Sequence, residues 1–467
     1  MENSNNKMTF GAAMFVLVGT AIIMGVCIMG LGLDAHIPLM FSMLLAAIVG
    51  LVKGYKWEDI YDGIRHGIND AVEPTIILAL VGLIIGTWIL SGTVPTIIYY
   101  GLKMMSPKTF LVVSTLVCAL VSTMTGSAWG TAGTVGIAFM GIGTGLGLSP
   151  AVTAGSVLTG AYFGDKMSPM SDTTILASGI AGADIWDHIR SMFWTTIPGF
   201  ALSLVVFAIL GVRASAETAG TPESIGIILN GLQSQFNINV LLILPAILVI
   251  GLAVMKKPAI PTLFGSSIFA GILAMVFQKG VTVKGVLVAM HYGYVSDTGV
   301  QIVDKLLSKG GLNGMMWSIS LILIALTFGG ILQKVKVMES IVEKIIDKIN
   351  SDGKLISANL LTCILGDAMM GTQYMGIIIG GKMFQSTYEK RNLQPYVQSR
   401  VLEDAGTLID CLIPWTIGAT FFASTLGVST IEYAPYVIMN WSVPIISAIY
   451  GFTGIAMFKK NKDIDGK

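Results

Sequence analysis

The sequence predicts an all-α, polytopic membrane protein built from two inverted-topology repeats that contain re-entrant hairpins and broken helices. Composition gives the first indication, because mean hydropathy is +0.77, 54% of the residues are hydrophobic and only 12% are charged. Soluble proteins carry about 25% charged residues. The other two indications are the length of the charge-free segments and an internal repeat.

Seven charge-free segments are long enough to cross a bilayer as a helix, which takes about 20 residues. None of them alternates apolar and polar residues as the strands of a membrane barrel do. They cover residues 8–33, 74–102, 191–212, 224–255, 258–278, 310–333 and 433–458.

The internal repeat has a constant offset of 245 residues. Adding 245 to positions 116–169 aligns twelve identical residues among 54 without a gap, including Asp165 with Asp410 and Pro169 with Pro414. Duplicated units are the usual construction of secondary transporters. We therefore predict a first repeat over residues 1–213, an extracellular connection over 214–237 and a second repeat over 238–467.

The distribution of lysine and arginine favours an inverted relation between the repeats. Cytoplasmic loops of membrane proteins are enriched in these residues. With both termini inside, most of the basic residues of the loops fall on the cytoplasmic side, while 214–237 and 426–436 lie outside and contain no Lys or Arg. We expect ten crossings and two hairpins, at 109–146 and 356–384, with an interfacial helix at 57–73.

Four hydroxyl groups in the first predicted hairpin are candidates for a substrate or proton path. They belong to the segment STMTGSAWGTAGTVG at 122–136, whose glycines permit close helix approach. Helix packing alone also explains such small residues. The candidate side chains are Ser122, Thr125, Ser127 and Thr131.

A polar break interrupts the predicted helix at 149–180. The sequence GDKMSPMSDTT at 164–174 follows 56 residues without a charge, and its proline removes a backbone donor, so carbonyl groups are freed. Intramembrane carboxylates usually mark an ion or substrate path. Alternatively, Asp165 pairs with Lys166 and Asp172 caps a half-helix. The candidate sodium ligands here are Asp165, Ser168, Ser171, Asp172 and Thr173.

The second repeat supplies a matching set of carboxylates. Asp410 corresponds to Asp165 but has no adjacent lysine, and Asp404 precedes it by six residues, nearly two helical turns, with Thr407 between them. Thr407 and Asp410 are further candidate cation ligands. Asp367, Glu403 and Asp404 are candidates for a proton path, although Arg400 is available to pair with Glu403 or Asp404.

Other functional classes lack support in the sequence. Cys27, Cys118, Cys363 and Cys411 form no CxxC pair, and the four histidines lack metal-ligand spacing. Nothing indicates nucleic-acid binding, a nucleotide-hydrolysing loop or a nucleophile and base for catalysis. We expect no cofactor and no enzymatic activity, and any transport to be secondary.

Two segments resemble the signature regions of the NhaC-type Na+/H+ antiporter family. They are GSAWGTAGTVG at 126–136 and GAYFGDKMSPMSDTT at 160–174. The resemblance implies a sodium-coupled exchanger in the bacterial inner membrane, which forms a homodimer. Members of the same family exchange malate for lactate with Na+ and H+, and others are proposed for amino acids.

Two functions therefore stay open. In the first, buried carboxylates bind Na+ and H+ alternately, which gives cation/proton antiport. In the second, a small organic anion or an amino acid moves with the ions, its carboxylate held by hydroxyl groups and half-helix N-termini. The expected partners are Na+, H+ and the lipid bilayer, with an organic anion as the alternative.

Overall fold

The computed structural model describes residues 8–217, 222–255 and 257–460, and apart from a single β-bridge between Leu393 and Lys459 the elements in these ranges are helices. Six of the described helices are long and apolar enough to cross a membrane, or up to nine if each bent pair is one span. The protein is thus an all-helical, multi-span membrane protein. The helix α2 (His36–Val52) is slightly shorter than these six.

The helix α3 (Trp57–Leu90) contains the segment that we expected to be a separate interfacial helix. That expectation was wrong, because residues 57–73 continue into the apolar part of the helix. This part of α3 packs closely on α16 (Gly311–Lys334) instead of lying at the membrane interface. A Cβ atom at Gly67 would lie 2.1 Å from the Leu326 carbonyl oxygen, and a Cβ atom at Gly330 would lie 2.2 Å from the Gly63 carbonyl oxygen.

The charge-free segment 224–255 also differs from the expected single span. It forms α11 (Pro222–Gln235), a 3₁₀ turn η3 (Val240–Ile243) and α12 (Leu244–Val254), with a bend of 92°. The chain turns at two asparagines: the Asn237 N–H donates to Gln278 Oε1 over 2.9 Å, and Asn239 Oδ1 caps η3 by accepting from the Leu241 N–H.

Both predicted hairpins are present. The first joins α5 (Pro107–Thr125) to α6 (Ala128–Thr131), the π-turn η2 (Ala132–Gly136) and α7 (Ile137–Gly145). The second joins α18 (Asp352–Met370) to α19 (Gln373–Lys390). Each turn contains a glycine with positive φ, 67° at Gly126 and 74° at Gly371, a conformation that glycine adopts without strain.

Both predicted broken helices are present as well. The first is α8 (Pro150–Met167) followed by α9 (Asp172–Ala181). The second comprises α20 (Pro395–Leu402), η4 (Glu403–Thr407) and η5 (Asp410–Leu412), followed after a 48° bend by α21 (Ile417–Leu426). Pro150 and Pro395 begin the two units, so the local geometry recurs at the 245-residue offset.

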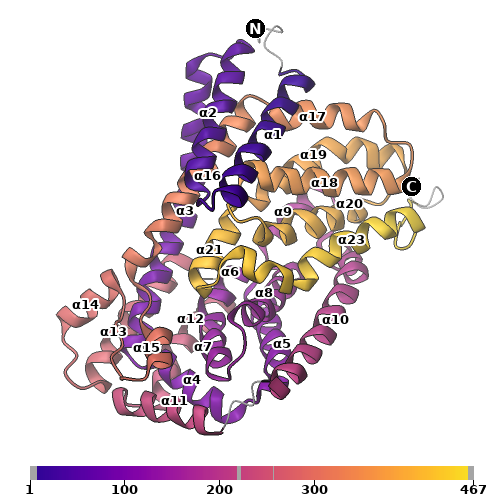
Figure 1. Ribbon diagram of the computed structural model, residues 1–467. Coiled ribbons are helices and arrows are strands. Elements are labelled where there is room, and N and C mark those ends of the chain that lie inside the picture. Colours follow the sequence, from indigo (N-terminus) through magenta and orange to yellow (C-terminus); the bar gives the residue numbers. More distant parts are fainter. Residues whose placement is uncertain (1–7, 218–221, 256, 461–467) are drawn as a thin grey trace.

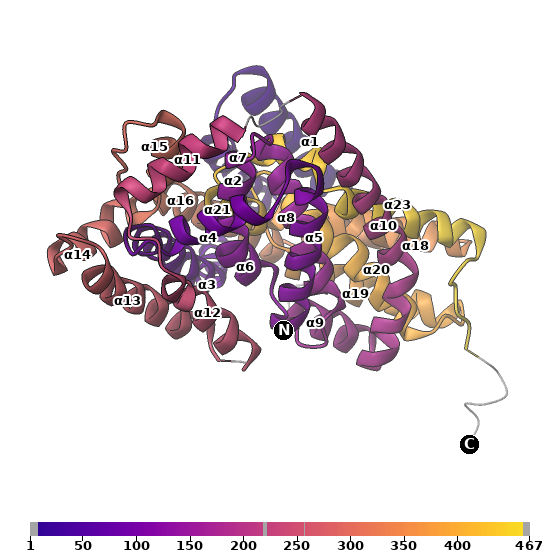
Figure 2. The ribbon, with the colours of Figure 1, turned by 90° about the horizontal axis from the view of Figure 1, so that it is seen from below.

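The helices form two flanks, and the turn of the first hairpin, with α6 and α7, lies between them (Figures 1 and 2). On one flank, α3 and α4 (Thr93–Met104) lie with α11, α12, α13 (Ala259–Phe277), α14 (Val283–Tyr292) and α15 (Gln301–Leu307). On the other lie α9, α10 (Ile185–Glu217), α18 to α20 and α23 (Ile438–Thr453). Beyond them, α1 (Phe10–Met24) packs with α2 and α17 (Val337–Ile346), and α22 is the short helix Thr430–Tyr433.

We expect Gly67→Val to destabilise the protein by about 1–3 kcal/mol or more, because overpacking a tight contact forces the backbones apart. The matched control is Gly251→Ala in α12, where an added Cβ would meet no atom within 4 Å. Thermal unfolding in detergent, followed by size-exclusion chromatography, measures both variants. Equal stability of the two would contradict the α3–α16 contact.

Candidate functional site

A cavity of about 780 Å³ lies where the two hairpin turns and the two helix breaks meet. Its wall combines α3, the first hairpin turn, the α8–α9 break, the second hairpin turn and the break before α21. The polar residues that line it are Asn69, Asp70, Glu73, Ser127, Asp165, Asp172, Thr372, Gln373, Tyr374 and Asp410.

Asp165 reaches the cavity from the last turn of α8. Two glycines bring this helix against α5, since a Cβ at Gly160 would lie 2.2 Å from the Thr115 carbonyl oxygen and one at Gly164 would lie 2.4 Å from that of Ala119. The Asp165 side chain is only 4% exposed, and its Oδ1 has no hydrogen-bond partner. It faces the Ala128 N–H and the Ser171 hydroxyl, which are donors suited to a carboxylate.

Asp410 reaches the same cavity from the second break. It is 1% exposed, and its Oδ1 has no hydrogen-bond partner. Its Oδ2 lies against the first turn of α21, where a Cβ at Gly418 would be 1.8 Å away. Position 418 therefore requires glycine, because any Cβ there would overlap the carboxylate. The Gly418 N–H faces this carboxylate, and the N-terminus of a helix favours negative charge. The two repeat-equivalent carboxylates are therefore brought to one cavity.

Asp172 joins the first break to the second hairpin. It is exposed at the cavity wall, its Oδ1 accepts from the Thr173 N–H over 2.9 Å, and its Oδ2 accepts from the Tyr374 hydroxyl. Asp172 is therefore the first residue of α9 rather than its N-cap, which is Ser171, and it also lines the cavity.

The hydroxyls of the first break form local hydrogen bonds. Ser168 Oγ accepts from the Met170 N–H over 3.2 Å, and Ser171 Oγ lies 3.0 Å from Thr173 Oγ1. All three predicted hydroxyl ligands are buried, and the Ser171 hydroxyl faces Asp165.

The first-hairpin hydroxyls are divided among different environments. Ser127 lines the cavity, while Thr125 and Ser127 line an adjoining cavity of about 420 Å³. Ser122 Oγ donates to the Ala161 carbonyl over 2.5 Å, and Thr131 Oγ1 donates to that of Ser127 over 2.9 Å. The hydroxyls of Ser122 and Thr131 are thus bound to backbone carbonyl groups, and neither residue lines either cavity.

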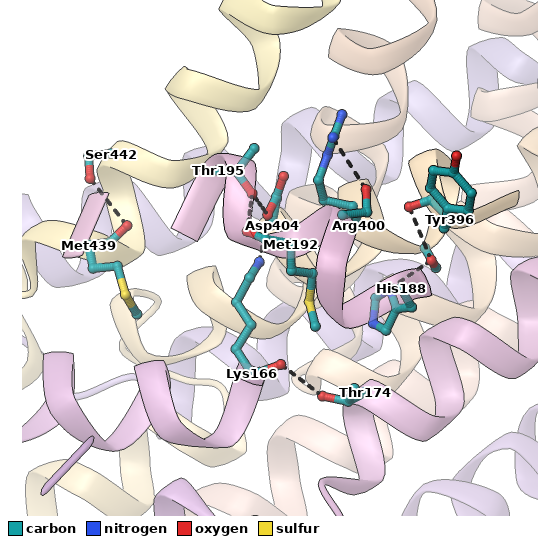
Figure 3. A network of polar contacts seen from close by, with 12 residues as sticks. Lys166, Thr174, His188, Met192, Thr195, Tyr396, Arg400, Asp404, Met439 and Ser442 are labelled. Atoms are coloured by element: carbon teal, nitrogen blue, oxygen red, sulfur yellow. Dashed lines mark hydrogen bonds and ion pairs between the residues drawn. The ribbon is translucent and has the colours of Figure 1, made fainter. Parts of the chain in front are cut away.

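A buried ion pair connects the two broken helices (Figure 3). Lys166 Nζ lies 2.5 Å from Asp404 Oδ1, both side chains are fully buried, and Thr195 of α10 donates to the same oxygen over 2.8 Å. The alternative in which Lys166 pairs with Asp165 was therefore wrong. Among the described residues, Asp165 has no ion-pair partner.

Arg400 pairs with neither of its two expected partners. Its Nη1 donates to Ser191 Oγ over 3.3 Å and to the Ala456 carbonyl over 3.1 Å.

The expected alignment of Asp404 with Asp410 on one side of a helix is also not found, since residues 403–407 form a π-turn and 410–412 a 3₁₀ turn. Asp404 consequently faces Lys166, and Asp410 faces the cavity.

Glu403 and Asp367 are fully buried, and none of their carboxylate oxygens has a hydrogen-bond partner. The hydroxyls of Thr407 and Thr173 face Glu403, so Thr407 is grouped with Glu403 rather than with Asp410. Asp367 faces the Gly376 N–H of α19. Neither Glu403 nor Asp367 lines the two cavities.

Several lining residues were not predicted. Asp70 and Glu73 belong to the segment expected at the membrane interface, Trp129 lies within the GSAWGTAGTVG segment but was not named as a site residue, and Tyr374 lies in no quoted motif. The position of Asp70 and Glu73 next to Pro74, at the start of a charge-free run, is the sequence signal that could have indicated them. Tyr374 follows the second hairpin turn, so the repeat could have indicated it.

A family model described as the Na+/H+ antiporter family matches residues 160–455, which contain the break between α8 and α9 and the whole second broken helix. This chain belongs to that family. It is a membrane antiporter of the NhaC type, a secondary transporter and not an enzyme, and the resemblance inferred from the two sequence motifs is confirmed.

The curated relatives of this antiporter have different cargoes. It is 41% identical over 455 residues to the Na+/H+ antiporter NhaC of Alkalihalophilus pseudofirmus, covering 97% of this chain and 98% of the relative. Identity to the arginine/ornithine antiporter ArcD of Halobacterium salinarum is 37% (97% and 94% covered). For the malate-2H+/Na+-lactate antiporter of Bacillus subtilis it is 35% (93% and 92% covered).

We expect Lys166→Met to destabilise the antiporter by about 3–5 kcal/mol, since it leaves a buried Asp404 carboxylate unpaired. The double variant Lys166→Met/Asp404→Leu should recover much of that loss, because no charge is then stranded. Lys334→Met is the control, as the Lys334–Asp62 pair is exposed and is worth less than about 1 kcal/mol. Unfolding in detergent measures these variants, and additive losses in the double variant would contradict the pairing.

Proposed function

We propose that this antiporter exchanges Na+ for H+ across the bacterial cytoplasmic membrane. The observation that carries the proposal is that Asp165 and Asp410, equivalent in the repeat, line one cavity, and each presents a carboxylate oxygen without a hydrogen-bond partner. Carboxylates are ligands for hard cations and also accept protons. One carboxylate cannot bind both at once, so occupancy by Na+ and by H+ is mutually exclusive.

The surroundings of the two carboxylates suit this exchange. Lys166 is held by Asp404, so it does not neutralise Asp165. The carbonyls freed at the breaks and the Ser171 hydroxyl supply further oxygen ligands for a sodium ion at Asp165. At Asp410, the Gly418 N–H stabilises the deprotonated carboxylate when no cation is bound.

We further propose that the two repeats, 1–213 and 238–467, are inverted and that their relative movement exposes the cavity to alternate sides. Support comes from the matched proline starts, the matched glycine turns and the lysine distribution. Both termini are then cytoplasmic, and the connection at 214–237 is extracellular. A homodimer completes this proposal on the basis of family resemblance.

A sodium- and proton-coupled exchange of organic acids is the second candidate function, because one relative is named as a malate/lactate antiporter. The cavity argues against an anion as its main occupant. Its lining contains five carboxylates and no Lys, Arg or His, so an anion that enters it meets charges of its own sign.

We expect Asp410→Asn and Asp165→Asn each to abolish proton-driven Na+ movement in proteoliposomes that carry a pH gradient and no sodium gradient. An amide cannot exchange a proton and is a weaker cation ligand. Asp347→Asn, at an exposed carboxylate outside the cavity, is the control. Full sodium movement in both cavity variants would overturn the proposed function.

The inverted arrangement predicts opposite labelling of two single cysteines in a cysteine-free background. Gly226→Cys lies in the connection helix α11, where a side chain meets nothing within 4 Å, and Lys354→Cys lies exposed at the start of α18. A membrane-impermeant maleimide added to whole cells should label the first and not the second. The reverse pattern would contradict the proposed topology.

A further inference from the structure

We propose that Tyr374 sets the charge selectivity of the large cavity. Its hydroxyl occupies the Asp172 carboxylate, so Asp165 binds the cation at the first break without help from Asp172, and the cavity takes a monovalent rather than a divalent cation. The inference rests on the proposed function, because it concerns the same cation site. It assigns a role to a residue of the second hairpin.

Two carboxylates face each other across the first break. Asp165 ends α8 and Asp172 begins α9, and both line the large cavity. Of the other four carboxylates that line this cavity, Asp172 is the one whose negative charge acts most strongly on Asp165. Neighbouring carboxylates are the usual ligands of divalent cations, whose affinity depends on the number of charged ligands. Left to itself, this pair would favour a divalent ion.

The two carboxylates differ in what the protein supplies to them. Asp165 is 4% exposed and its Oδ1 has no hydrogen-bond partner, so this oxygen requires a cation or a proton. Both oxygens of Asp172 have donors: Oδ1 accepts from the Thr173 N–H over 2.9 Å, and Oδ2 accepts from the Tyr374 hydroxyl. The N-terminus of α9 stabilises the negative charge of Asp172 further. Asp172 is therefore satisfied without a cation.

The second hairpin holds Tyr374 in place for this contact. The hairpin turns at Gly371, where φ is 74°, and Thr372 caps α19 by accepting from the Tyr374 N–H over 3.4 Å. Tyr374 thus lies in the first turn of α19, half-buried in the cavity wall. Its side chain reaches Asp172 from the other half of the chain, so the selectivity of the first break depends on the second hairpin.

Charge balance explains why this contact favours a monovalent ion. One carboxylate neutralises a bound Na+, and the Ser171 hydroxyl that faces Asp165 adds a neutral oxygen ligand. A divalent ion bound by Asp165 alone would keep one uncompensated positive charge next to a buried group, which is unfavourable. A second carboxylate ligand removes this penalty. The tyrosine hydroxyl therefore excludes divalent ions by occupying the oxygen that they would need.

Tyr374→Phe tests this inference, because it keeps the aromatic ring and frees Asp172 Oδ2. The probe is Mn²⁺, which prefers carboxylate oxygen ligands and whose free concentration is measured by electron paramagnetic resonance. We expect the purified full-length variant to bind Mn²⁺ about tenfold more tightly than the unmodified antiporter, which corresponds to about 1.4 kcal/mol. In proteoliposomes, Mn²⁺ should inhibit proton-driven Na+ movement by the variant at a correspondingly lower concentration.

Two further variants serve as controls. Tyr374→Phe/Asp172→Asn should lose the added Mn²⁺ affinity, because an amide is a weaker cation ligand than a carboxylate. Tyr292→Phe removes the hydroxyl of a tyrosine that is 65% exposed and lines neither cavity, and it should leave Mn²⁺ binding unchanged.

Unchanged Mn²⁺ affinity in Tyr374→Phe, with intact proton-driven Na+ movement in the unmodified protein, would overturn this inference alone. A gain in affinity that persists in the double variant would also overturn it, since Asp172 would then not be the added ligand. Absence of proton-driven Na+ movement in the unmodified protein would overturn the proposed function instead, and the Mn²⁺ comparison would still decide whether Tyr374 keeps Asp172 from binding a cation.

Discussion

The structure depends on helices that end inside an apolar interior. A helix end leaves backbone N–H and C=O groups without partners, and such groups are tolerated at membrane depth only where they are buried in protein or line a cavity. Among the described residues, four of these interruptions lie at or beside the large cavity: two hairpin turns, at Gly126 and Gly371, and two breaks, at 168–171 and 413–416. All four contribute to the wall of the large cavity or lie next to it.

The interruptions are held together by direct contacts within the second half of the chain and between the two halves. The Ile417 N–H donates to the Gly371 carbonyl over 2.8 Å, and Trp415 Nε1 donates to the Ala368 carbonyl over 2.6 Å, so the second break is fixed to the second hairpin. Tyr374 connects that hairpin to Asp172 in the first half, and Lys166 connects the first broken helix to Asp404 in the second. A movement of one half relative to the other must therefore change the cavity lining.

The sequence predicted those features that local chemistry determines. Pro169, the glycines at 126 and 371 and the repeat offset were enough to place both hairpins and both breaks, and they identified Asp165 and Asp410. The contacts of Lys166 could not be predicted, because its partner Asp404 is 238 residues away and Asp165 is its neighbour in sequence. The continuity of α3 was missed for a similar reason, since it depends on the backbone of α16 at Leu326 and Gly330.

The distribution of buried charge links protons to cations throughout the interior. Among the described residues, five carboxyl groups are buried, at positions 165, 367, 403, 404 and 410, together with one lysine, Lys166, one arginine, Arg400, and the imidazole of His188. If the carboxyl groups, the lysine and the arginine were ionised and the imidazole were neutral, three negative charges would remain uncompensated in a medium of low dielectric constant, which is strongly unfavourable. Protons or bound cations must therefore supply the missing charge. On the function proposed above, a cation that enters takes over the charge compensation from a proton, and when the cation leaves a proton compensates the charge again.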